Sequence, residues 1–132
     1  MNLKDRTNLL KDLCARIPYS VKCQCLGRIG TVRSIDTFGN TEVEGFSGSI
    51  VIDISHVKPY FFPLSSMTEE QKAELDKAIY EDGKEAMNAI RNNDKMFHTP
   101  WRATDWLNKN HFDYRGLISM GLANNASGLN IY

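Results

Sequence analysis

Two prolines close together separate a first part of the chain with strand patterns from a second part with helix patterns. Pro59 and Pro63 lie in the segment 57–64. Proline lacks the backbone N–H that a helix interior or an inner strand requires. We therefore expect an extended connector here, with its aromatic residues laid against the body. A chain of 132 residues suits one domain with a shared core, and the connector indicates two subdomains within it, 1–63 and 64–132.

One helix and several short strands are predicted before the connector. Leucines recur at helical spacing through residues 3–16, which predicts an amphipathic helix that ends before Pro18. Alternating and β-branched segments then predict strands over 19–25, 31–37, 41–44 and 49–54. This order predicts an N-terminal helix with a small curved antiparallel sheet or partial barrel.

Helices dominate the part after the connector. Thr68 and Gln71 have the spacing of a capping box, which predicts a helix start, and Gly83 is a weak point within that helix. Its predicted buried stripe consists of Leu75, Ile79, Ala86 and Ile90.

Two further helices are predicted near the C-terminus. Thr99 and Pro100 pair a capping residue with a favoured first helical residue, so we expect a helix from Pro100 to Lys109. Asp113 is placed to cap a last short helix over 114–120, and the tail at 124–128 has a turn-like composition. The predicted fold class is therefore α+β, with a helical C-terminal subdomain.

The cysteines and histidines favour neither a disulfide framework nor a metal site. Three cysteines in a chain without a secretory signal are unlike the even set of a disulfide scaffold. Cys23 and Cys25 alternate on a predicted strand, so they share a face and suit a small apolar role, whereas a redox role for them or Cys14 stays open. The histidines, His56, His98 and His111, have no finger-like spacing relative to the cysteines, so we expect no metal and no cofactor.

The charge distribution leaves nucleic-acid binding as an alternative function. The chain is neutral overall, but residues 1–33 carry seven Lys or Arg against two Asp. A basic patch there would bind phosphates locally. Its candidate residues are Arg6, Lys11, Arg16, Lys22, Arg28 and Arg33. With a charged amphipathic start and no apolar run of membrane-spanning length, we expect a cytoplasmic protein without membrane contact.

No catalytic motif in the sequence is accompanied by the other residues that its mechanism requires. Residues 45–49 read G-x-S-G-S, as around the nucleophile of trypsin-like proteases, but that mechanism needs an upstream histidine base and a longer double barrel. A glycine-serine hairpin turn explains the same letters. His98 and His111 are more simply structural residues. We therefore expect no enzymatic activity, with a small enzyme of unrecognised site as a third alternative.

Aromatic residues gather in two places, the connector at 60–62 and the region 101–114. They are the basis of the leading hypothesis, a protein-interaction module. Irregular aromatic segments are common at protein interfaces. Burial of most of these rings between the subdomains is the competing interpretation, and Trp106 is the expected anchor of the helical part. The candidate partner-binding residues are Tyr60, Phe61, Phe62, Trp106, His111 and Tyr114.

Two longer segments resemble a family of uncharacterised proteins. Residues 58–70 read KPYFFPLSSMTEE, and residues 111–123 read HFDYRGLISMGLA. Both resemble segments of small proteins from anaerobic gut bacteria, which often lie in prophage-like regions. The resemblance implies a mobile-element origin and assigns no activity and no site residue.

Overall fold

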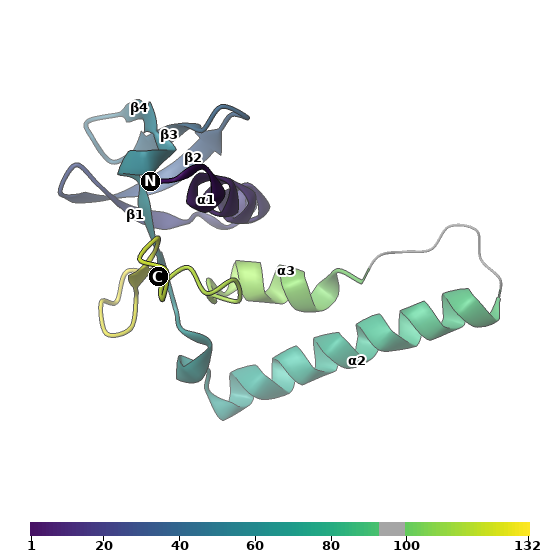
Figure 1. The fold of residues 1–132 in the computed structure, drawn as a ribbon. Helices are drawn as coiled ribbons and strands as arrows, with labels where there is room; N and C mark the ends of the chain where they lie inside the picture. The colour runs from purple at the N-terminus through teal and green to yellow at the C-terminus, as the bar shows by residue number, and fades with distance from the viewer. Residues whose placement is uncertain (93–99) are drawn as a thin grey trace.

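The protein consists of a sheet body and a long helical arm. The computed structural model describes residues 1–92 and 100–132. Figure 1 shows helix α1 packed on the sheet, and helix α2 running away from this body with α3 beside it. No helix among the described residues is long and apolar enough to cross a bilayer.

The body combines α1 (Leu3–Arg16) with a six-stranded sheet in the order β4-β3-β2-β1-β5-β6. The first five strands in this order pair antiparallel, and β5 pairs with β6 in parallel, so the sheet is mixed and does not close into a barrel. The α+β fold class and the N-terminal helix are confirmed. The strands are β1 (Lys22–Cys25), β2 (Arg28–Ile35), β3 (Asn40–Glu44), β4 (Ser49–Asp53), β5 (Lys58–Phe61) and β6 (Asn124–Asn125). Three short 3₁₀ turns cover Ile17–Tyr19, Ile54–His56 and Leu64–Ser66.

The segment 57–64 is extended and lays Tyr60 and Phe61 against the body, as expected, but Lys58–Phe61 form strand β5, which the prolines were expected to prevent. Pro59 faces Cys23 of β1, whereas β6 pairs only with Tyr60 and Phe61 further along the strand. At Pro59 the strand therefore has a partner on one side only. A missing N–H is tolerated on an unpaired strand side, which explains how the proline fits.

The core lies between α1 and the sheet. Cys23 and Cys25 are both buried in it, as their alternation predicted. Burial raises the pKa of Cys23 to about 12 and also raises that of Cys25, so neither thiol is activated as a thiolate. The buried cluster consists of Leu9, Leu13, Val21, Cys23, Cys25, Val32, Val43, Ile54, Val57, Phe61, Leu117, Leu122 and Ala123.

Arg16 is fully buried at the end of α1, next to the equally buried Asp12. Its Nε lies 2.8 Å from Asp12 Oδ2, and its Nη2 donates a hydrogen bond of 2.6 Å to the Phe112 carbonyl. The guanidinium also lies over the Phe61 ring, 4.0 Å from its centroid. Burial raises the pKa of Asp12, against the opposing charges of Arg16 and Arg115. The hydrogen bond from Arg16 to Phe112 and the ion pair between Arg115 and Asp12 therefore fasten the C-terminal segment to α1.

The long helix α2 (Glu69–Arg91) begins as predicted. The Thr68 hydroxyl accepts from the Gln71 N–H, and the Gln71 side chain accepts from the Thr68 N–H, which completes the capping box. The expected break at Gly83 is absent, and the helix continues to Arg91.

Helix α3 (Arg102–Lys109) begins two residues after Pro100, and its cap comes from α2. The two carboxylate oxygens of Asp82 each accept a hydrogen bond of 3.0 Å, from the N–H groups of Arg102 and Ala103. The predicted cap, Thr99, lies outside the described residues. A carboxylate from a neighbouring helix thus satisfies donors that a local cap would otherwise serve.

The predicted helix over 114–120 is wrong, because this segment forms turns. Asp113 does accept from the N–H groups of Leu117 and Ile118, at 2.8 and 2.9 Å. Gly116, however, has φ of +75°, a left-handed conformation that interrupts a right-handed helix. The tail is likewise not only turns, since Asn124 and Asn125 form β6 against β5.

Candidate interaction surface

The aromatic residues singled out in the sequence meet at the junction of β5, α3 and the C-terminal segment. Two of them cannot contact a partner, because Phe61 is fully buried and Tyr60 is 9% exposed. Phe62 is half-buried between the rings of Phe112 and Tyr132, with centroid distances of 6.1 and 5.8 Å. Most of this aromatic surface is therefore structural.

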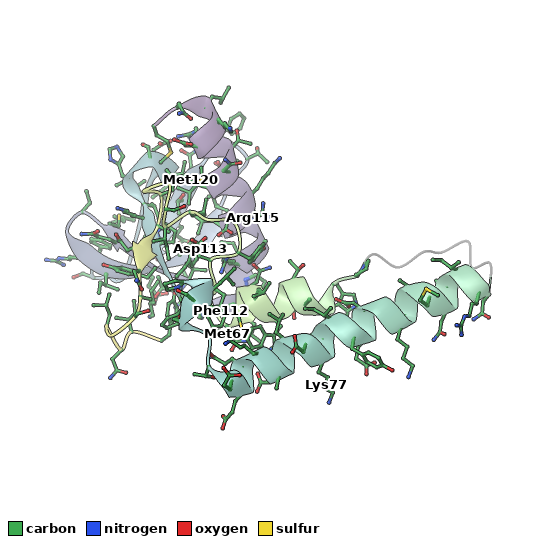
Figure 2. The ribbon with its side chains drawn as sticks, turned by 60° about the horizontal axis from the view of Figure 1, so that its bottom comes forward. Met67, Lys77, Phe112, Asp113, Arg115 and Met120 are labelled. Carbon is green, nitrogen blue, oxygen red and sulfur yellow. The ribbon has the colours of Figure 1, made fainter. Side chains whose placement is uncertain are left out.

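Trp106 links the arm to the body. Its half-buried ring stacks on Phe112, with centroids 5.6 Å apart and planes 9° apart. Its Nε1 donates a hydrogen bond of 3.0 Å to Glu74 on α2. The ring thus bridges α2, α3 and the segment that follows α3, and Figure 2 shows Phe112 at this junction.

His111 and Tyr114 belong to the same packed region. The His111 ring stacks on Tyr132 at a centroid distance of 3.6 Å, and its buried Nδ1 has no hydrogen-bond partner among the described residues. Burial and the charge of Arg16 lower the pKa of His111 to about 4, so the ring is neutral near pH 7. The Tyr114 hydroxyl donates to Asn108 at 2.8 Å. His98 lies outside the described residues.

Two adjoining hollows open beside Phe62, with volumes of about 370 and 380 Å³. The polar side chains around the first hollow are hydroxyls and an amide, and two of them, Thr68 and Gln71, are already committed to the capping box. Among the described residues, no carboxylate, histidine or cysteine lines either hollow.

The basic residues of the N-terminal part do not form one free surface. Arg16 is buried and unavailable to a phosphate. Arg6 binds both oxygens of Asp53 at 2.7 Å, and this pairing holds the pKa of Asp53 well below its usual range. Arg33 pairs with Glu44.

The remaining three basic candidates differ in their contacts and lie on different elements. Lys22 donates to the Thr31 hydroxyl at 2.9 Å. Lys11 and Arg28 are exposed, and no ion pair among the described residues involves either. Lys11 lies on α1, whereas Arg28 begins β2.

An exposed apolar surface lies on the far half of α2, where the sequence predicted burial. Ile79 is 53% exposed and Ile90 is 65% exposed, although both belong to the predicted buried stripe. Tyr80 and Met87, at 67% and 50%, extend the same surface around a hollow of about 500 Å³. We call this surface the α2 patch: Ile79, Tyr80, Gly83, Lys84, Met87, Ile90 and Arg91.

The patch is exposed because α3 covers a different side of α2. The contacts with α3 come from Glu74, Asp82 and Glu85. At 3.6 residues per turn these three lie roughly opposite Tyr80 and Met87. Helix α3 is also short, since eight residues span about 12 Å against about 35 Å for the 23 residues of α2. Residues 1–92 and 100–132 therefore leave much of the far half of α2 without cover.

Gly83 lies in the middle of the patch and packs against no other side chain in the described part of the chain. A Cβ added there would meet no atom within 4 Å. Glycine inside a helix costs about 1 kcal/mol relative to alanine. Nothing within the described residues compensates for this cost.

The charges of α2 differ between its two sides. Its carboxylates toward α3 are engaged, with Glu74 on Trp106 and both Asp82 and Glu85 on Arg102. The patch instead carries Lys84 and Arg91. Neither takes part in an ion pair among the described residues. The exposed Asp76 lies on the same side of α2, so a partner would meet two cations and one carboxylate beside apolar side chains.

The apolar residues of α2 cover a wide arc of the helix surface, and this was the sequence signal for an exposed patch that the sequence analysis overlooked. Tyr80 and Met87 lie outside the stripe of Leu75, Ile79, Ala86 and Ile90, so the apolar residues of α2 extend beyond one face. Only Leu75 and Ala86 of that stripe are half-buried.

Comparison with known proteins adds no relative: no family model, no curated protein and no solved structure matches this chain.

Proposed function

We propose that this protein is a protein-interaction module that binds a helix of a partner protein on the α2 patch. The observation that carries the proposal is the contiguous exposed apolar surface around Gly83, on a helix that extends from the body (Figure 1). Exposed apolar patches of this kind mark interaction sites in soluble proteins.

The shape of the patch favours a helix as the bound element. Ile79, Gly83, Met87 and Ile90 follow one another at the spacing of helix ridges, with a gap where the glycine lacks a side chain. A second helix can approach closely at that gap and pack its side chains between Ile79 and Met87.

The flanking charges define the chemistry of the partner. Lys84 and Arg91 are seven residues apart, about 10.5 Å along the helix axis. A partner helix with apolar residues on one face and carboxylates beside them complements this arrangement. Nucleic-acid binding has less support, because Arg6, Arg16 and Arg33 are already paired or buried. The cytoplasmic location and the mobile-element origin stay expectations from the sequence.

A synthetic helical peptide provides the test. The probe carries leucines at i, i+3, i+4 and i+7 and glutamates beside them, seven residues apart, with a fluorescent label for anisotropy. We expect saturable binding that Met87→Glu weakens at least tenfold, whereas Val51→Glu on β4, also at an exposed apolar residue, leaves it unchanged.

A version of the peptide with lysine in place of glutamate controls for the charges and is expected to bind more weakly. Absence of saturable binding, or equal binding by Met87→Glu and Val51→Glu, would contradict the proposal.

A further inference from the structure

We infer that the partner helix is α2 of a second copy, so that two chains form an antiparallel dimer crossing at Gly83. The inference rests on the proposed function and identifies its partner. A twofold dimer requires a surface that complements itself. Two pairs of residues on the face of α2 away from α3 meet this requirement: Ile79 with Met87, and Asp76 with Arg91.

The apolar side chains of the patch complement each other when Gly83 lies against Gly83 of the second copy. Ile79 and Met87 are each four residues from the glycine, on opposite sides of it. In an antiparallel arrangement Ile79 of one copy therefore faces Met87 of the other. Two glycines at the crossing allow close approach of the helix backbones.

The charges agree with the same register. Asp76 lies seven residues before Gly83 and Arg91 eight residues after it, or about 10.5 and 12 Å along the axis. Each Arg91 thus comes to nearly the same height as Asp76 of the second copy, and on the same side of the crossing. Both side chains are exposed, and no ion pair among the described residues involves either. The dimer would contain this ion pair twice.

Among the residues that the structure describes, the remainder of the molecule leaves this face open. In both views the sheet body and α3 lie on one side of α2. Figure 2 shows Lys77 pointing away from α3 on the opposite side. A second α2 can therefore lie along the helix without meeting either body.

The contact area predicts a weak dimer. A single helix pair about 35 Å long falls at the low end of specific interfaces, below about 1,200 Å² in total. Association should therefore depend on protein concentration in the micromolar range or above.

Sedimentation equilibrium of the full chain tests the inference. We expect a reversible monomer–dimer equilibrium that Gly83→Leu weakens about a hundredfold or more, because leucine fills the gap at the crossing. Leucine is a better helix former than glycine, so this variant keeps α2 folded, which circular dichroism checks. Val51→Glu is the control and should sediment like the parent protein.

A charge exchange tests the register. Arg91→Asp should weaken dimerisation about tenfold, and the double variant Asp76→Arg/Arg91→Asp should restore it. A protein that stays monomeric at every concentration would overturn the inference. So would a dimer whose dissociation constant is unchanged by Gly83→Leu and by the charge exchange. If the chain is monomeric but still binds the acidic helical peptide, only the dimer fails. If it also does not bind the peptide, the proposed function fails as well.

Discussion

Arg16 is fully buried and His111 is half-buried, and burial together with the guanidinium charge of Arg16 opposes protonation of the imidazole. Both residues were considered for function in the sequence, Arg16 for nucleic acid and His111 for a partner. Their contacts instead hold the C-terminal segment against α1 and β5. At the scale of single residues, the charged Arg16 and the titratable His111 therefore have structural roles.

Acid should destabilise the fold through His111. Its pKa in the folded protein is about 4, below the ordinary value of 6.5, so the unfolded chain takes up the proton first. The contribution of His111 to the free energy of unfolding is therefore fully present above pH 6.5. It is lost as the pH drops toward 4, and the total loss is about 3 kcal/mol. Urea unfolding across this range measures the effect.

His111→Asn should remove most of this dependence on pH between 6.5 and 4. The residue has φ of +62°, a left-handed conformation that asparagine tolerates well. His56→Asn, at an exposed position, is the matched control and should keep the slope of the parent. An equal slope in the parent and in His111→Asn would show that other groups cause the acid sensitivity.

Helices α2 and α3 depend on each other through Asp82. Although burial works against its charged form, hydrogen bonds from the backbone N–H groups of Ala103 and Arg102 hold its pKa below the usual range. Asp82→Ala should destabilise α3 by about 1 kcal/mol, as expected for loss of a capping side chain.

Asp76→Ala is the matched control, since it removes the same side chain from the opposite face of α2. Thermal melts in dilute solution should show a lower Tm for Asp82→Ala and an unchanged Tm for Asp76→Ala. Equal melting of the two variants would mean that α3 does not need the cap.

Local patterns predicted some elements of this fold well and others badly, for identifiable reasons. The capping box at Thr68 and the alternation at Cys23 act within a few residues, so sequence alone identified them. The strand at Pro59 depends on which side of β5 is paired, and the cap of α3 comes from 20 residues away. Contacts of that range leave little trace in a local pattern.

The candidate site could not be predicted from the sequence for a related reason. The apolar stripe of α2 was correctly seen as helical, but a stripe does not show whether another part of the chain covers it. Ile79 and Ile90 became surface residues because α3 packs on a different side. For the aromatic residues near α3 the sequence left an interface and burial both open, and Phe112 is buried while Trp106 stacks on it.

At the scale of the whole molecule, the body and the arm have different roles. The body holds the buried core, whereas the far half of α2 contributes few buried side chains and carries the exposed patch. Helix segments with little tertiary packing open easily, and binding on their surface stabilises them. Occupancy of the α2 patch should therefore change the stability of α2 far more than that of the sheet.

Amide hydrogen exchange followed along the chain tests this account most directly. The full-length protein is compared in dilute solution, in concentrated solution and with saturating acidic helical peptide. The account predicts slower exchange over residues 79–91 in the concentrated sample and with peptide, with unchanged exchange in β2 and β3. Unchanged exchange over 79–91 in both samples, or protection confined to β4 or to the residues around Phe62, would contradict it.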